Sequence, residues 1–291
     1  MDCALRLLMM GLAGCAHAAP AAATGQLDAR IDESSGLVES RAWPGVFWTH
    51  NDSGDAPRIF AVRSNGALVR EVAVEGAKNV DWEDIAVGEP GRLWIADTGN
   101  NGNDRRDLTV YGLPEPDPAG TGGGRADALI HVSYPEQRGF PDPASRNYDA
   151  ESLFWADGTL WLLTKHRSDL KTVLYRFPAL SGDVALERVQ DFDLGGDPNH
   201  YGGSATGADL DPTGRYLALL SYHALFVFER PADGKSWLGQ LVHRVDFNQG
   251  VMRQCEGVAW DGGGVLITNE EGRMFRIADP LHVARFPERT P

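Results

Sequence analysis

The chain of 291 residues has little cysteine and little positive charge. It contains three Cys, and only Cys255 lies outside the first 19 residues. Without paired cysteines, a disulfide framework and cysteine-rich metal sites are excluded. The 27 Lys and Arg are outnumbered by 41 Asp and Glu, so that the formal net charge is −14. This excludes a nucleic-acid partner, because phosphate binding needs a basic surface.

Long apolar runs are also scarce, and the clearest one is at the amino terminus. Residues 1–19 combine a single Arg with the run Leu7–Leu12, which predicts a signal peptide too short for a stop-transfer helix. Within it, Leu12-Ala13-Gly14-Cys15 matches the bacterial lipobox, in which Cys15 receives diacylglycerol. The alternative is plain secretion with cleavage after Ala18. We expect residues 20–25 to be a tether. A periplasmic or outer-membrane-associated lipoprotein that touches the membrane only through this anchor is predicted.

A short phrase recurs along the rest of the chain, in which an acidic or small residue opens an apolar run. The copies are Glu83-Asp84-Ile85-Ala86, Glu151-Ser152-Leu153-Phe154 and Glu256-Gly257-Val258-Ala259, with weaker ones at Ser35-Gly36-Leu37-Val38 and Ala208-Asp209-Leu210. Successive copies are 48, 68, 57 and 48 residues apart. Such periods indicate repeated structural units.

Each phrase is followed by a Gly-containing turn and a second apolar run that ends on a polar residue. The distance from the first residue of the phrase to this polar residue is 14 in four copies, which end at Asp97, Lys165, Tyr222 and Glu270. In the first copy it is 14 or 15, at Thr49 or His50. A constant distance across a turn predicts a repeated β-hairpin.

The remaining segments are short, β-branched or aromatic and bounded by turn residues, and none has a helical period. Four such strands in about 50 residues are typical of a β-propeller blade. We therefore predict an all-β propeller with five four-stranded blades, although the long second interval does not exclude six. The last strand, 282–286, is weak, so we expect 26–32 to complete the last blade and close the ring. Residues 26–291 would then form a single, monomeric domain.

In a propeller the first strand of each blade lies innermost, so its start and the end of the second strand emerge at the same mouth. We therefore expect an acidic mouth at one end of the axial channel. Its predicted members are Glu83, Glu151 and Glu256 with Asp97, Lys165, Glu270 and His50. His166 and His200 are further candidates.

Two interpretations of these acids remain open. Calcium takes six to eight oxygen ligands, so Glu83, Asp97, Glu151, Glu256 and Glu270 would hold Ca²⁺ or another divalent cation. Without a cation, the clustered carboxylates would repel and their pKa values would rise. Alternatively, each Glu binds backbone amides of the next blade and recurs only because blades recur, and Lys165 forms an ion pair with Glu151. Cys255 is expected to pack in an inner strand, since Glu256 would weaken it as a nucleophile.

Two family resemblances follow from these motifs. Glu256-Gly257-Val258-Ala259-Trp260 is similar to the Glu-Gly-Pro-x-Trp motif of the regucalcin/gluconolactonase group, which implies that Glu256 binds an axial divalent cation. Thr206 stands where that group has a metal-binding Asn. Segments 49–55, 81–86 and 93–101 resemble exported bacterial β-propellers that are phytase-like or unassigned, over most of residues 30–275. This second resemblance implies the fold and little chemistry.

The sequence therefore supports two classes of function. The first is a metal-dependent hydrolase of a small ester, lactone or phosphoester, in which the cation activates water and His50 or Lys165 acts as general base or stabilises the developing anion. The second is a non-catalytic propeller of the cell envelope that presents the same mouth to a small ligand or a protein.

Overall fold

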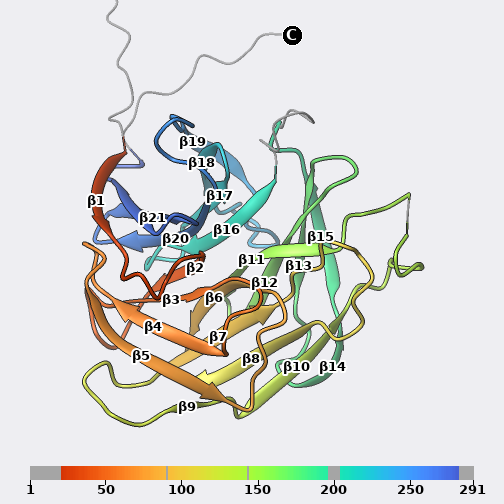
Figure 1. The fold of residues 1–291 in the computed structure, drawn as a ribbon. Helices are drawn as coiled ribbons and strands as arrows, with labels where there is room; N and C mark the ends of the chain where they lie inside the picture. Colours follow the sequence, from red (N-terminus) through yellow and green to blue (C-terminus); the bar gives the residue numbers. More distant parts are fainter. Residues whose placement is uncertain (1–20, 90, 143, 196–203, 282–291) are drawn as a thin grey trace, which may run out of the picture.

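Twenty-two strands and no helix make up the described part of the chain, residues 21–89, 91–142, 144–195 and 204–281, in the computed structural model (Figure 1). The strands form five small sheets that are arranged around a central axis. The predicted all-β propeller is therefore confirmed, with five blades rather than six. Within the described ranges, no helix is long and apolar enough to cross a membrane.

Each blade contains at least three consecutive antiparallel strands, and the first of these is innermost. Blade 1 contains β2 (Ser34–Glu39), β3 (Phe47–Asn51), β4 (Arg58–Val62), β5 (Leu68–Glu75) and β9 (Gly124–Arg125). Blade 2 contains β6 (Trp82–Gly88), β7 (Arg92–Asp97), β8 (Thr109–Pro114), β10 (Ala128–Ser133) and β14 (Gly182–Ala185). Blade 3 contains β11 (Asp149–Ala156), β12 (Thr159–Lys165), β13 (Thr172–Arg176) and β15 (Glu187–Phe192). Blade 4 contains β16 (Ala205–Leu210), β17 (Tyr216–Ser221), β18 (Ala224–Glu229) and β19 (Gln240–Asp246). Blade 5 contains β20 (Cys255–Asp261), β21 (Gly264–Asn269), β22 (Arg273–Ile277) and β1 (Ala22–Gln26).

Burial changes from the axis to the rim of each blade. The inner strand β6 is buried along its whole length, whereas the outer strand β5 alternates between exposed and buried residues towards its end. A strand that is covered on both faces reads as a continuous apolar run, and a strand with one wet face alternates. This difference explains why the inner hairpins were the clearest repeats in the sequence.

The hydrophobic core is divided into five clusters, and each lies between two neighbouring blades. Trp94 of blade 2 and Leu162 of blade 3, for example, belong to one cluster. Phe60 of blade 1 and Met274 of blade 5 belong to another, which joins the first blade to the last. Five interfaces for five blades mean that the ring is closed. Burial of apolar surface therefore stabilises every blade from both sides.

An amino-terminal strand completes blade 5, as predicted, but it is an earlier segment than expected. β1 pairs antiparallel with β22, from Ala22 opposite Arg276 to Gln26 opposite Arg273. Residues 22–25, which we expected in the tether, therefore belong to the fold. Residues 27–32, which we expected to be the strand, form a turn whose Leu27 and Ile31 are buried. The predicted signal peptide and the expected strand 282–286 lie outside the described residues.

Two short strands extend blades beyond four strands. β9 pairs parallel with β5, and β14 pairs parallel with β10. β9 lies at the end of the segment 114–125, for which the run Gly122-Gly123-Gly124 predicts a loop. β14 comes from the chain of blade 3, so it joins blades 2 and 3 at the rim.

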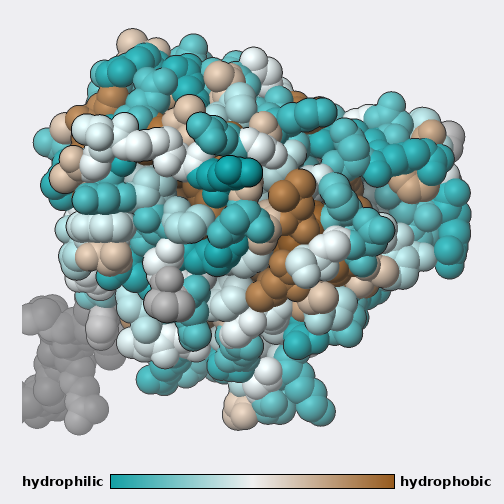
Figure 2. Space-filling view, turned by 90° about the horizontal axis from the view of Figure 1, so that it is seen from below, coloured by the Kyte–Doolittle hydropathy of each residue, from teal (hydrophilic) through white to brown (hydrophobic). Residues whose placement is uncertain are grey.

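Large apolar side chains are scarce on the outside. The face in Figure 2 is mostly hydrophilic, with its largest apolar patch to the right of the centre. Six large apolar side chains are exposed in the described part of the chain: Val69, Val80, Leu129, Leu241, Val251 and Leu281.

Candidate functional site at the axial mouth

An irregularity in pairing recurs at the start of all five innermost strands. The register shifts between Trp82 and Asp84, between Ala150 and Ser152, and between Cys255 and Gly257. Equivalent shifts lie in β2 and β16. Each bulge leaves a residue outside the ladder and re-aims its side chain. These residues are Glu83, Glu151 and Glu256, with Ser35 and Thr206 in the other two blades.

The position of the bulge in β16 shows that the fourth repeat was misaligned with the others in the sequence. The shift in β16 lies between Ala205 and Gly207, so Thr206 occupies the position that the three glutamates occupy elsewhere. The sequence placed Ala208 there, because the phrase Ala208-Asp209-Leu210 resembled the other copies. Thr206 is buried, and its hydroxyl donates a hydrogen bond to the carbonyl of Cys255 at 2.8 Å. Blade 4 therefore contributes no acid at this position.

The pairing register also corrects the alignment of the residues that end the second strands. Asp97 pairs with Trp82, just before Glu83, while Thr164 pairs with Ala150, just before Glu151. Asp97 is thus equivalent to Thr164 and not to Lys165. The residues one position further on are Asp52, Thr98, Lys165, Tyr222 and Glu270. All of these except Thr98 line a cavity at the mouth.

This cavity has a volume of about 610 Å³ and lies where the three bulge glutamates meet. Its walls are polar or charged, which is unusual for a ligand pocket. The lining residues are Asp52, Glu83, Asn101, Glu151, Lys165, Arg167, Tyr222, His223, Gln249, Arg253, Gln254, Glu256 and Glu270. The structure therefore brings together five of the seven site residues that the sequence predicted.

The other two predicted site residues lie elsewhere. His50 is fully buried, its ring packs edge-on against Trp82 at 5.5 Å, and its Nδ1 lies 3.0 Å from the carbonyl oxygen of Asn51. Burial lowers the pKa of His50 to about 4, so its imidazole is neutral at pH 7. Asp97 accepts a hydrogen bond from the backbone N–H of Asp81 at 3.0 Å and pairs with Arg105 at 2.9 Å. Neither residue lines the cavity.

Lys165 links three blades through hydrogen bonds. Its Nζ donates to both carboxylate oxygens of Glu151, at 2.5 and 2.6 Å, and to the hydroxyl of Tyr222 at 2.8 Å. That hydroxyl in turn donates to Glu256 Oε1 at 3.2 Å. An ammonium group has three N–H donors, so Lys165 has none left for a ligand. Burial disfavours its charge, but Glu151 outweighs this effect and the pKa of Lys165 is raised.

Only one of the two carboxyl oxygens of Glu256 has a hydrogen-bond partner in this network. Its Oε2 is buried and has no hydrogen-bond partner. Burial raises the pKa of Glu256 well above its usual range, and the nearby carboxylates of Glu151 and Glu270 raise it further. The raised pKa favours the protonated form of Glu256, the form in which a carboxyl group can donate a hydrogen bond.

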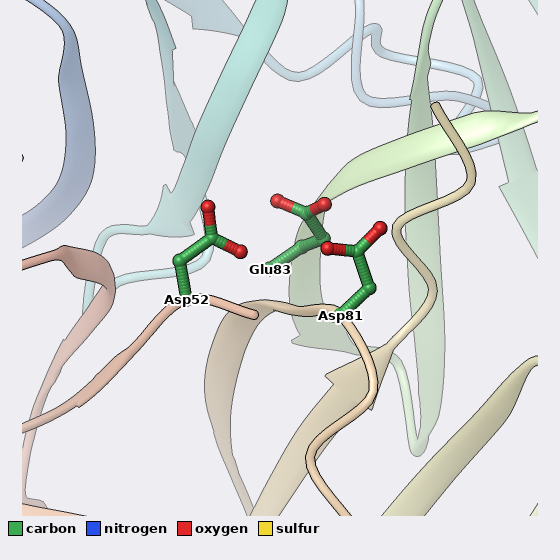
Figure 3. A group of neighbouring side chains, drawn as sticks. All are labelled: Asp52, Asp81 and Glu83. Carbon is green, nitrogen blue, oxygen red and sulfur yellow. The ribbon is translucent and has the colours of Figure 1, made fainter. Parts of the chain in front are cut away.

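Glu83 is the centre of two carboxylate triads. One triad combines it with Asp52 and Asp81, and the other with Asp149 and Glu151; within each, one oxygen per residue lies within 4.8 Å of the others. Figure 3 shows that Asp52, Asp81 and Glu83 point towards one another. Burial raises the pKa of Asp81 to about 6, and the charges of Asp52 and Asp149 contribute. Burial also raises the pKa of Glu83 well above its usual range, and the negative charge of Glu151 raises it further.

The two triads differ in how their charge is balanced. In the second, Asp149 pairs with Arg167 at 2.8 Å and Glu151 pairs with Lys165 at 2.5 Å. In the first, Asp52, Asp81 and Glu83 form no ion pair with any described residue. The chain itself therefore supplies ion-pair partners to Asp149 and Glu151 of the second triad, and none to the three members of the first.

Gly99 makes room for the first triad. A Cβ atom at this position would lie 2.1 Å from Glu83 Oε1 and 2.4 Å from the carboxylate of Asp81. Real Cβ atoms do not approach other atoms so closely, and only Gly lacks this atom. The turn after β7 therefore depends on glycine to admit the two acids.

Several residues of the site were missed in the sequence. Asp52 and Asp81 lie just outside strands, and Asp149 and Arg167 lie two residues from the predicted Glu151 and Lys165. Asp52 and Asp81 are part of the quoted family motifs 49–55 and 81–86, and Asp52 also lies in the loop 51–55, which follows a second strand and was expected at the mouth. Cys255 is fully buried in β20, as expected, and burial raises the pKa of its thiol, so that the thiolate is disfavoured.

Comparisons with known proteins extend to the fold only. No known family and no curated protein matches the sequence. Among solved structures, the PQQ-bound aldose sugar dehydrogenase from Streptomyces coelicolor is 12% identical, with a TM-score of 0.47 over 87% of this chain and 95% of that chain. The Cps50 (Swd1) β-propeller domain from Myceliophteria thermophila is 11% identical, with a TM-score of 0.41 over 84% and 96%. The resemblance to the regucalcin/gluconolactonase group thus rests on the quoted motifs alone, and the chain is assigned by its own sheet topology as a five-bladed β-propeller.

Proposed function

We propose that this protein is an exported, lipid-anchored β-propeller that holds a divalent cation between Asp52, Asp81 and Glu83. The observation that carries the proposal is the buried carboxylate of Glu83, which lies beside Asp52 and Asp81 and, like them, forms no ion pair with a described residue. Oxygen-only donor sets from carboxylates are what Ca²⁺ and Mg²⁺ prefer. A buried charge of this kind is costly unless it is paired or binds a metal.

Of the five metal ligands expected from the sequence, only Glu83 remains in the proposed cation site. Glu151 has both oxygens bound to Lys165, so it would have to break this ion pair to become a ligand. Asp97 is bound to Arg105 and lies outside the cavity. Glu256 and Glu270 line the cavity beside Tyr222 and are left to face the substrate.

We propose further that the mouth is the active site of a hydrolase for a small ester, lactone or phosphoester. A divalent cation at this position supplies Lewis-acid activation of a substrate oxygen and of water. Glu256 lines the cavity, its Oε2 has no hydrogen-bond partner, and burial raises its pKa, so it is suited to deliver a proton to a leaving group as a general acid. Lys165 positions Tyr222 and Glu151 and does not itself reach a substrate, since its donors are all in use.

All three N–H donors of Lys165 are in use, so it cannot act on a substrate. This favours a second candidate, a non-catalytic binding propeller of the cell envelope. In this case the same cavity would bind a small polar ligand without turnover. The two candidates share the cation site and differ in chemistry.

Calcium titration followed by activity assays separates these candidates. Isothermal titration should show binding to the parent and a loss of at least about tenfold in affinity for Glu83→Gln, because a charged ligand is removed. Asp209→Asn is the matched control, because Asp209 is a partly buried acid outside this cavity. Metal-stripped and calcium-loaded protein are then compared on esters, lactones and phosphomonoesters. Absence of calcium binding refutes the cation site, and binding without turnover in any metal state leaves the binding propeller.

The direction of β1 supports a defined orientation on the membrane. Gln26, at the end of β1, donates a hydrogen bond to the carbonyl of Glu271, in the turn after β21 at the mouth. Because β1 is a strand, its first residue Ala22 lies at the opposite end of blade 5. An anchor at Cys15 would therefore leave the mouth facing away from the membrane. Replacing Cys15 by Ser should release the protein from the membrane fraction, and retention of the variant there would contradict the anchor.

A further inference from the structure

The segment between β19 and β20, residues 247–254, forms one wall of the mouth. It contributes Gln249, Arg253 and Gln254 to the cavity lining. The segment is fixed at three points: Gln249 Nε2 donates to the carbonyl of Tyr222 at 3.1 Å, Met252 is buried, and Glu270 N donates to the carbonyl of Gln254 at 3.2 Å. This wall is therefore held in place before any ligand binds.

Gln254 has a left-handed backbone conformation, with φ of 46°. This region is unfavourable for a residue with a Cβ atom, and glycine would occupy it without strain. Many turns of this chain do use glycine at positive φ, including Gly262 and Gly263 in the next hairpin. At position 254 the chain instead keeps a long amide side chain that lines the cavity. Retained strain of this kind is found at ligand-binding positions.

Arg253 is the one basic residue of the cavity lining without a partner among the described residues. Lys165 is paired with Glu151 and Arg167 with Asp149. Arg253 is exposed, lines the same cavity, and forms no ion pair there although five acids line it too. A free guanidinium in an acidic cavity has its donors available for an anion from outside the protein.

We propose that Arg253 and Gln254 form an oxyanion subsite, so that the ligand of the mouth carries a phosphate or carboxylate group. A guanidinium presents paired N–H donors that match both groups, and the Gln254 amide adds a further donor. This inference rests on the proposed function in one respect: the cation between Asp52, Asp81 and Glu83 neutralises the acids that would otherwise repel the anion. The subsite would then determine which esters or lactones are accepted, by selecting those with an anionic substituent.

The test uses inorganic phosphate and acetate as separate probes, titrated into calcium-loaded and metal-free protein. We expect the parent to bind at least one of them, and Arg253→Gln to bind it at least about tenfold more weakly, because a charge-assisted hydrogen bond is lost. Calcium affinity should not change in this variant. Arg125→Gln is the matched control, since it removes the same charge from an exposed position in β9, outside the cavity.

A second variant tests the strained residue. Gln254→Gly should have an unchanged or higher melting temperature and weaker binding of the same probe, whereas a merely structural Gln254 would leave probe binding unchanged. The subsite is refuted if Arg253→Gln binds both probes as the parent does, or if the parent binds neither probe in either metal state. Loss of calcium binding alone would refute the cation site and not the subsite. The metal-free titrations then decide, because the acids weaken probe binding by the parent and by Arg253→Gln alike, and a difference between the two still reports on Arg253.

Discussion

Lys165 Nζ lies 2.5 and 2.6 Å from the two carboxylate oxygens of Glu151, and both side chains are about 5% exposed or less. The ion pair that was one of two interpretations of the sequence is thus present, and it is buried. Exposed pairs contribute only about 0–1 kcal/mol, but removal of one partner from a buried pair leaves an uncompensated charge. Glu151 and Lys165 therefore have a structural role, whatever binds at the mouth.

Glu151→Gln should lower the free energy of unfolding by about 3 kcal/mol or more, because the buried ammonium of Lys165 loses its carboxylate. Urea denaturation measures this change. The double variant Glu151→Gln/Lys165→Met should lose less than the sum of the two single variants. An additive result, or a loss below about 1 kcal/mol, would mean that the pair is hydrated in solution.

Gly99→Ala should weaken calcium binding by about tenfold or more, since the new methyl group displaces the carboxylates of Glu83 and Asp81. Gly102→Ala, in the same turn, is the control, because its Cβ would meet only the side chain of exposed Asp104. Isothermal titration of calcium into both variants measures the effect. Equal affinities would show that the first triad does not hold the cation.

Asp209 should make stability depend on pH. Burial raises its pKa from 3.8 to about 7, even though it accepts a hydrogen bond from the backbone N–H of Trp260 and lies near Arg41, while nearby Glu39 favours the rise. The folded state then binds a proton more tightly than the unfolded state, so stability falls as pH rises from about 4 to about 7.

Between pH 5 and pH 8 this loss should be on the order of 2 kcal/mol. Denaturation of the parent and Asp209→Asn at both values measures it, and the variant should lose less stability over the same interval. A parent and variant with parallel pH profiles would show that Asp209 is ionised in both states.

Removal of β1 should destabilise the whole ring, because blade 5 would lose its outer strand and β22 would expose an unpaired edge. A chain that starts after Gln26 should melt at a lower temperature than one that starts at Ala21. Thermal unfolding followed by circular dichroism compares the two chains. Equal melting temperatures would mean that β1 does not contribute to closure.

The repeat itself could be found in the sequence. The innermost hairpins are buried on both faces, so they appear as continuous apolar runs, and Glu83, Glu151 and Glu256 open three of them. A periodic sequence folds into periodic blades, and equivalent positions then meet at the axis. For this reason the fold, the mouth and five of its residues were predictable.

The membership of the site was decided by tertiary structure. A count of 14 residues made Asp97 equivalent to Lys165, although Asp97 is one position out of register, because the two hairpin turns differ in length. Gly88 pairs with Arg92, four residues further on, whereas Ala156 pairs with Thr159, three residues further on. Asp52, Asp81 and Glu83 come from blades 1 and 2, and their proximity depends on how two blades pack. Sequence thus determined which strands reach the axis, whereas the bulges and the contacts between blades determined which side chains face one another there.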